Sequence, residues 1–329
     1  MSGIIIIILG SLGLAVQNVL IRVIFASSSI FGQLEWGGFL APSPGHSLLI
    51  LALRSLLVCP IIFYLSQRWY PETRPTLQRL LQPIQRQLLV QAVVASALLF
   101  LALALFFMAI AIIPAGVAIV LFFTHPITTG LIAWFCFGYR PSRLRLLVTC
   151  GVLIGSILVA PPISSIGDQA ALGVGLAITA SFAYSGQGLL AQVCFRQMNP
   201  IPFTVVNFVV MALLSNLSLL VFSTNVPPTA WPELLLIIAF TAGLTLAGQL
   251  AYNIGIQKVS AAAMAIVAVS NPMFTVLMAW IGLSEMLIGR QWLGIAIILI
   301  SILSLSRDRP VPIATTTAAS GTSERIKAD

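Results

Sequence analysis

The sequence predicts an all-α membrane protein with ten transmembrane helices, arranged as two inverted five-helix repeats. Composition sets the class: 59% of the 329 residues are hydrophobic, only 7% are charged, and the mean hydropathy is +1.06. No soluble domain can bury that much apolar surface, so a polytopic helical protein is expected. The repeats are indicated by an apolar segment that occurs twice and by an odd number of spans in each half.

The repeated segment is Ala115–Trp134 in the first half and Ala261–Trp280 in the second. The copies lie 146 residues apart, and each has a proline near its centre, Pro126 or Pro272. A central proline frees a backbone carbonyl and kinks the helix, and in lipid such a defect survives only inside protein or beside a water-filled cavity. Paired interrupted helices therefore predict a binding site near the membrane midplane. The alternative is chance similarity between two apolar segments.

A transmembrane helix needs about 20 apolar residues. Ten such stretches are expected, at residues 4–26, 48–66, 88–111, 115–138, 146–160, 172–195, 203–222, 234–256, 261–283 and 292–305. Breaks at 113–116 and 257–260 make tight hairpins of the third and fourth spans and of the eighth and ninth. The N-terminal stretch lacks a basic n-region, so it is interpreted as a retained span and not as a signal peptide.

The distribution of basic residues predicts that both termini are cytoplasmic. In that orientation 13 of the 16 lysines and arginines lie in cytoplasmic loops or the tail. We expect a multi-pass protein of the inner (plasma) membrane. Five spans per half is an odd number, so the two halves have opposite orientations. The repeats are expected at residues 1–160 and 161–306, followed by a disordered cytoplasmic tail at 307–329.

Several function classes are excluded by the sequence. The net charge is +8, but the basic residues sit in short loops, so nucleic acid is not an expected partner. No HExxH, GxSxG or Walker A motif and no in-span aspartate pair is present, so neither an enzyme nor a cofactor or metal is expected. The expected partners are the lipid bilayer and a small-molecule substrate, with a homodimer left open. Four cysteines without CxxC spacing are interpreted as buried free thiols: Cys59, Cys136, Cys150 and Cys194.

Charged and titratable residues within spans are costly and are weighed one by one. Arg54 lies seven residues into the expected second helix, where it either binds an anionic substrate group or extends to the outer interface. For Arg22, nearer a helix end, extension to the interface is favoured. His125 either changes charge near neutral pH or, as we favour, hydrogen-bonds a carbonyl freed by Pro126. No Asp or Glu lies inside an expected span, which favours facilitated diffusion or substrate exchange over a carboxylate proton relay.

Uncharged polar residues supply the remaining candidates. Gln249, Tyr252 and Asn253 share one face of the expected eighth helix. Such residues either line a cavity or hydrogen-bond between helices as packing contacts. Trp134 and Trp280 are expected toward opposite membrane faces, as interfacial anchors or as gates. The complete set of expected cavity residues is Gln17, Arg54, His125, Tyr184, Gln187, Asn207, Gln249, Tyr252, Asn253 and Asn271.

Two further features concern packing and the outer face. Small residues on the first and sixth helices (Gly10 and Gly13; Ala180 and Ala183) are expected to allow close approach of helix backbones. The segment 27–47 is interpreted as an interfacial loop, with a lid over the outer mouth as the alternative.

The second half resembles the EamA-type members of the drug/metabolite transporter superfamily through the stretch 255–263, Asn271-Pro272, Ala279-Trp280, Gly282 and Glu285. The first half resembles the same pattern through the stretch 114–118, Pro126, Ala133-Trp134 and Gly138, and departs from it at Tyr139-Arg140, where the family has an acidic residue. The resemblance covers about residues 3–306. It implies a central cavity lined by the first four helices of each half, with the fifth helices peripheral, and export of small metabolites by alternating access.

The sequence thus predicts a transporter, in the export direction, of small polar or amphipathic metabolites such as amino acids. One alternative is a channel or facilitator with an uncharged pore. Another is a sugar or nucleobase permease of the same fold.

Overall fold

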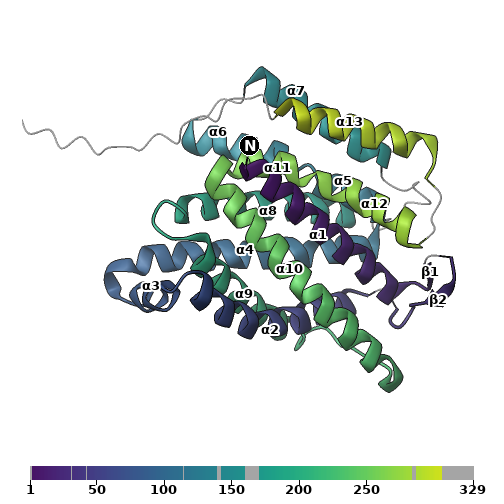
Figure 1. The fold of residues 1–329 in the computed structure, drawn as a ribbon, viewed down its shortest axis with the longest axis horizontal. Coiled ribbons are helices and arrows are strands. Elements are labelled where there is room, and N and C mark those ends of the chain that lie inside the picture. The colour runs from purple at the N-terminus through teal and green to yellow at the C-terminus, as the bar shows by residue number, and fades with distance from the viewer. Residues whose placement is uncertain are drawn as a thin grey trace, which may run out of the picture.

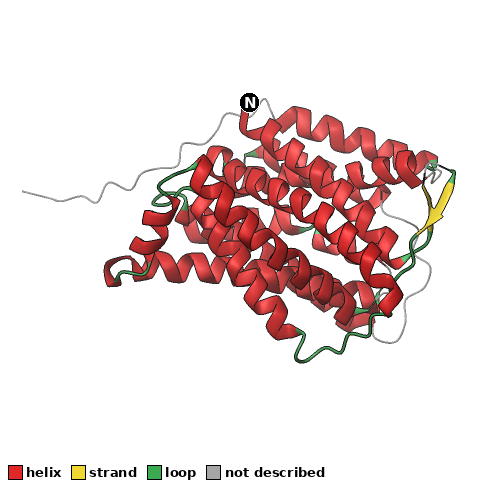
Figure 2. Ribbon diagram, turned by 60° about the horizontal axis from the view of Figure 1, so that its bottom comes forward, coloured by secondary structure: helices red, strands yellow, loops and turns green. Residues whose placement is uncertain are grey.

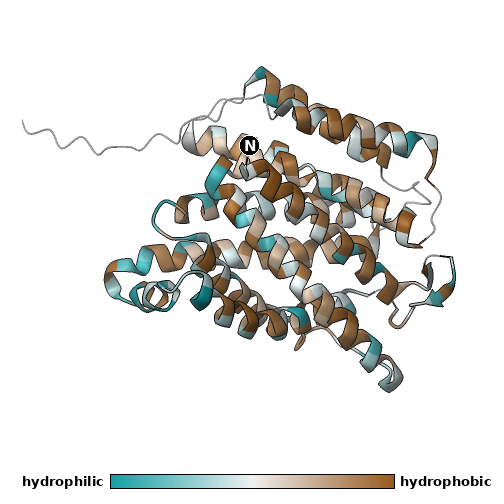
Figure 3. Cartoon of the chain, viewed as in Figure 1, coloured by the Kyte–Doolittle hydropathy of each residue, from teal (hydrophilic) through white to brown (hydrophobic). Residues whose placement is uncertain are grey.

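The computed structural model describes residues 2–30, 32–41, 43–113, 115–138, 142–159, 170–283 and 287–305. The helices lie side by side in one bundle between two ends (Figure 1). A short β-hairpin lies at one end, shown in yellow in Figure 2, and helix α3 lies at the other. Hydropathy follows this arrangement, because hydrophilic residues gather at both ends and hydrophobic residues cover most of the helices between them (Figure 3).

The first half of the chain contains α1 (Ser2–Phe25), β1 (Ser28–Ile30), β2 (Leu34–Trp36), α2 (Pro44–Trp69), α3 (Thr73–Leu80), the 3-10 turn η1 (Pro83–Gln85), α4 (Arg86–Ile112), α5 (Ala115–Phe122), α6 (His125–Phe137) and α7 (Arg143–Val159). The second half contains α8 (Ala170–Cys194), α9 (Pro200–Ser218), η2 (Pro228–Ala230), α10 (Trp231–Val259), α11 (Ala261–Ala268), α12 (Ser270–Leu283) and α13 (Gly289–Leu305).

Eight segments of the described chain are long and apolar enough to cross a membrane. They correspond to α1, α2, α4, α5 with α6, α8, α9, α10, and α11 with α12. The two remaining expected spans are α7 and α13, which have 17 residues each and fall below that length. The structure therefore agrees with an all-α membrane protein, and the number of ten spans stays a prediction.

The two proline-containing segments are broken rather than bent. In the first half α5 ends at Phe122 and α6 begins at His125, and in the second α11 ends at Ala268 and α12 begins at Ser270. Each proline thus lies in the first turn of a new helix, where a missing backbone N–H leaves no hydrogen bond unmade. Both Pro126 and Pro272 are buried within the bundle.

One helix begins earlier than expected, and two of the expected connections contain regular structure. Helix α2 begins at Pro44 and not near residue 48, because proline is favoured in a first turn and the Ser43 hydroxyl accepts the His46 N–H at 3.1 Å. The loop expected before α4 contains α3 and η1. The outer loop contains the β-hairpin, whose Ile30 and Trp36 pack on the ends of α1 and α12.

Glycines set the closest helix contacts. A Cβ on Gly10 of α1 would lie 2.8 Å from the Ala251 Cβ and 3.2 Å from the Gly248 carbonyl oxygen, both on α10. Gly155 of α7 and Gly294 of α13 approach each other's carbonyl oxygens in the same way, and these two helices lie side by side at the edge of the bundle (Figure 1). The close approach expected at Gly10 is thus present, on α10.

The cysteine expectation holds only in part. All four thiols are free, but only Cys194 is buried, whereas Cys136 and Cys150 are exposed on the bundle surface and Cys59 is intermediate. In a protein surrounded by lipid an apolar residue need not face inward, because lipid tails are as apolar as the core. Apolar character within a span therefore does not predict burial.

Replacing Gly10 with alanine is expected to lower the free energy of unfolding by about 1–3 kcal/mol, because the new methyl group overlaps α10. The matched change is Gly243→Ala, where a Cβ meets nothing within 4 Å. That control should be neutral or slightly stabilising, because alanine favours the helix over glycine. Equilibrium unfolding in mixed micelles measures both, and equal stability of the two variants would contradict the packing described for α1 and α10.

Candidate functional site

The break between α5 and α6 places His125 in the buried interior of the bundle. Its ring is 1% exposed and lies against the ring of Tyr184 on α8, with centroids 4.8 Å apart, and against Phe122 and Phe123 at 5.7 and 5.5 Å. The ring atom Nδ1 has no hydrogen-bond partner among the described residues. The hydrogen bond expected from this ring to a freed carbonyl is thus not made through Nδ1, and aromatic packing surrounds it instead.

Hydroxyl groups gather beside this break. The carbonyl oxygen of His125 accepts hydrogen bonds from Thr129 at 2.7 Å, Thr128 at 3.1 Å and Ser185 at 3.1 Å. The Thr128 hydroxyl also contacts the hydroxyl of Ser185, and Thr124 contacts that of Ser181 at 3.1 Å. None of these five hydroxyl residues was among the expected cavity residues, although the i, i+4 spacing of Thr124 with Thr128 and of Ser181 with Ser185 was a signal.

The second break is lined by amides and one phenol. Asn18 of α1 donates to the side-chain oxygen of Asn271 on α12 at 2.9 Å, and the Asn271 amide lies 3.4 Å from the Ser11 carbonyl oxygen. The Ser11 hydroxyl is 2.9 Å from the hydroxyl of Tyr252 on α10. Thr275 donates to the Asn271 carbonyl at 2.9 Å, as Thr129 does to His125 in the first half. This site joins α1, α10 and α12.

Polar residues continue from both breaks along the interior. Gln17 accepts a hydrogen bond from Thr245, and Asn253 donates to Thr204 of α9 at 2.9 Å. Several buried atoms have no partner in the described part of the chain: both side-chain polar atoms of Asn207, Nε2 of Gln187, and Oδ1 of Asn253. A buried donor or acceptor without a partner costs about 1–3 kcal/mol. Asn207, Gln187 and Asn253 therefore keep unmet hydrogen-bonding capacity in the interior.

Most of the expected cavity residues lie in a closed interior. Eight of the ten are buried, namely Gln17, Arg54, His125, Gln187, Asn207, Tyr252, Asn253 and Asn271. Tyr184 and Gln249 are half-buried.

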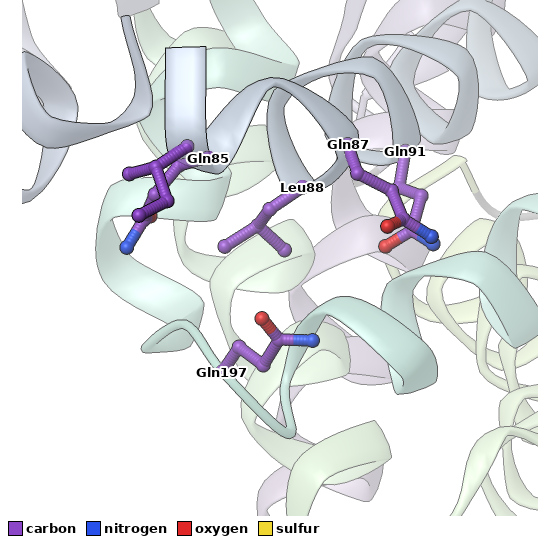
Figure 4. A pocket seen from close by; sticks show the side chains of 6 residues that line it. Gln85, Gln87, Leu88, Gln91 and Gln197 are labelled. Carbon is purple, nitrogen blue, oxygen red and sulfur yellow. The ribbon is translucent and has the colours of Figure 1, made fainter. Parts of the chain in front are cut away.

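Two hollows lie away from these residues. One, of about 270 Å³, lies at the α3 end and is lined by Ile84, Gln85, Gln87, Leu88, Gln91 and Gln197. Figure 4 shows Gln87 and Gln91 together on α4, across from Gln197 after α8. The other, of about 470 Å³, is an apolar groove on α2 and α9. Neither of these two hollows is lined by an expected cavity residue.

The candidate tryptophans and arginines differ in solvent exposure. Trp134 and Trp280 are about two-fifths exposed, at 42% and 40%, three residues before the ends of α6 and α12. That position favours interfacial anchoring over gating. Arg22 is exposed near the end of α1, in agreement with extension to the interface. Arg54 is 4% exposed, so its side chain does not extend to the interface.

The contact between Ser11 and Tyr252 is expected to link α1 to α10 energetically. In a double-mutant cycle of Ser11→Ala and Tyr252→Phe, the coupling energy should be about 0.6 kcal/mol, the average for hydrogen bonds between membrane helices. Equilibrium unfolding of the four proteins gives this value. Thr179, which is exposed and bonds within its own helix, serves as the control, and a cycle of Thr179→Ala with Tyr252→Phe should show no coupling.

Comparisons with known proteins agree with a transporter. Residues 171–307 match the model of the EamA-like transporter family. A protein from Synechocystis sp., named as an uncharacterized transporter, is 35% identical over 95% of each chain. A solved crystal structure has the same fold with a TM-score of 0.72 at 15% identity, covering 93% of this chain and 96% of the other. This chain therefore belongs to the EamA-like transporter family and is a multi-pass membrane transporter.

Proposed function

We propose that the protein exports small polar or amphipathic metabolites, such as amino acids, by alternating access between two inverted five-helix halves. The substrate would bind near the two helix breaks, among the buried polar residues of α1, α6, α8, α9, α10 and α12. Export is the direction that the family resemblance implies. The termini would be cytoplasmic and the membrane the inner (plasma) membrane, which puts the α3 end inside.

The observation that carries the proposal is the correspondence between the halves. Helices α5 and α11 have eight residues each and begin 146 positions apart, and α7 and α13 have 17 residues each at the same offset. The first helix of each half packs on helices of the other half. Helix α1 packs on α10, α11 and α12, and its equivalent α8 packs on α4, α5 and α6. The remaining equivalent helices pair with each other, α2 with α9 and α7 with α13. A pseudo-two-fold relation accounts for all of these pairs.

The closed interior favours alternating access over an open pore. A channel with an uncharged pore would present a continuous polar path, whereas the buried polar residues here are bonded across helices or enclosed. The acidic residues bear on whether transport is coupled to protons. Glu233, in the first turn of α10, is the one acidic residue within the described helices. Facilitated diffusion or exchange is therefore favoured over a carboxylate proton relay.

The site assignment is tested by flux in proteoliposomes over amino acids, sugars, nucleobases and cationic drugs. Gln249→Ala and Tyr252→Phe are expected to reduce transport of the accepted substrate at least tenfold, because each removes polar contacts at the binding space. Thr179→Ala should transport like the wild type. The flux should not depend on a pH gradient, and a dependence that His125→Asn abolishes would instead assign proton coupling to His125. Flux unaffected by both site variants would reject the assignment.

The orientation is tested by labelling single cysteines in intact cells with a membrane-impermeant thiol reagent, in a background without the four native cysteines. A cysteine at Gln33, in the hairpin turn, should react from outside. A cysteine at Gln82, between α3 and η1, should react only after the membrane is opened. The reverse pattern would place the termini outside and reject the proposed orientation of the chain in the membrane.

A further inference from the structure

Arg54 is a buried cation in the middle of the bundle. It is the eleventh residue of α2, roughly 15 Å from the helix start at 1.5 Å per residue, and 15 residues before the helix ends. It lies on the face of α2 that also carries the buried Leu51 and Val58. Its guanidinium atoms Nε and Nη1 have no hydrogen-bond partner among the described residues. A charged group in this position is costly, and such groups in membrane proteins are typically functional.

The helices around Arg54 do not supply a paired carboxylate in the described structure. Helix α2 packs on α9, α10, α4 and α3. Of these, α4, α9 and α3 contain no acidic residue. Glu233 is in the first turn of α10, with its Oε2 atom unpaired, and Glu72, at the start of α3, accepts a hydrogen bond from Tyr70 at 3.3 Å. Neither carboxylate makes an ion pair with Arg54, so the charge is not balanced by these helices.

Unpaired buried polar atoms on the helices that contact α2 include donors and acceptors: Nδ2 and Oδ1 of Asn207 on α9, and Oδ1 of Asn253 and Oε2 of Glu233 on α10. Asn207 of α9 is fully buried, and neither of its side-chain polar atoms has a partner. Gln187 of α8 is 2% exposed, and its Nε2 atom is unpaired. The guanidinium atoms of Arg54 are donors for the oxygens of an anion, and Asn207 Nδ2, on the adjacent α9, is a further unpaired donor. A planar guanidinium suits a carboxylate or phosphate in particular, because it can donate two parallel hydrogen bonds.

We infer that the central site takes a ligand with an anionic group, a carboxylate or a phosphate, and that Arg54 binds this group. The inference rests on the proposed transport function and narrows its substrate class. Purely cationic drugs, neutral sugars and nucleobases lack the required group. Zwitterionic amino acids and organic anions contain it.

A consequence follows for the transport cycle. The site with Arg54 alone carries one positive charge, whereas the site with a bound monoanion is neutral. Because an unpaired charge within the membrane is costly, the loaded protein should reorient more readily than the empty one. Flux should then be faster when the same anion is present on the opposite side of the membrane.

The inference is tested by thermal unfolding of the purified full-length chain with benzoate and glycerol phosphate, against benzamide, benzylamine and glycerol, at constant ionic strength set with chloride. The two anions should raise the melting temperature saturably, and the neutral and cationic counterparts should not. Arg54→Gln should abolish the effect, and Arg54→Lys should retain it with affinity weakened about tenfold, because lysine loses the paired geometry. The control Arg68→Gln, at an exposed position in the last turn of α2, should respond like the wild type.

The unliganded variant separates ligand binding from a structural role. Without added anion, Arg54→Gln should melt at the same temperature as the wild type or higher, because it removes an unpaired buried charge. A lower melting temperature together with an unchanged response to anions would show that Arg54 is structural and overturn the inference. The inference would also be overturned if benzylamine or benzamide stabilised the wild type as much as benzoate does. A wild type that none of the probes stabilises would overturn it as well.

Three other results would show whether the anion site or the proposed transport function is wrong. If chloride, titrated separately, is the only anion that acts through Arg54, the residue holds an inorganic ion and the inference about substrate is overturned. If organic anions bind through Arg54 but no compound is transported and none shows stimulation from the opposite side, the anion site stands and the proposed transport function fails. If cations are transported and Arg54→Gln does not change their flux, the transport function stands and the anion site is overturned.

Discussion

The structure depends on one constraint: a backbone polar group inside a membrane must find its hydrogen-bond partner within the protein. The two broken segments violate helical pairing, so each is expected inside the protein, where polar partners are available. Hydroxyl side chains lie beside both breaks: Thr129 and Ser185 donate to the His125 carbonyl, and Thr275 donates to that of Asn271. The breaks are buried in the interior, and the polar residues that flank them are brought there too. A polar centre in an apolar bundle follows from this constraint.

Much of the fold could be predicted because its signals are local. Long apolar stretches and two prolines at a fixed offset predicted where the helices lie and which two are interrupted. The start of α2 at Pro44 was missed because proline and glycine in sequence indicate a loop as readily as a first helical turn. The exposure of Cys136 and Cys150 was missed for a different reason. Inside and outside are both apolar for a membrane helix, so hydropathy alone cannot separate lipid contacts from core contacts.

The candidate site was predicted less completely. Spacing on one helix predicted that Gln249, Tyr252 and Asn253 share a face, and Tyr252 and Asn253 are buried while Gln249 is half-buried. Spacing could not predict that their partners are Ser11 and Thr204, because those contacts depend on which helices pack together. Serine and threonine were overlooked because they occur in membrane helices for several reasons and individually carry little signal. Their role at the α5–α6 break emerges only when α6 and α8 are seen side by side.

Helix α1 is linked to α10 and to α12 by different kinds of contact, and this difference bears on alternating access. Helix α1 is held to α10 by close packing at Gly10, whereas its polar links to α12 are hydrogen bonds between Asn18, Asn271 and Thr275. Close packing cannot slide without overlap, but a single hydrogen bond between membrane helices is worth only about 0.6 kcal/mol and can be exchanged for one to water or substrate. In the proposed cycle, therefore, α1 and α10 would move as one body, and the opening would form between that body and α12. Asn271 lies at this boundary with Tyr252 close by through Ser11, so the residues that would first meet a substrate are those whose present partners are easiest to replace.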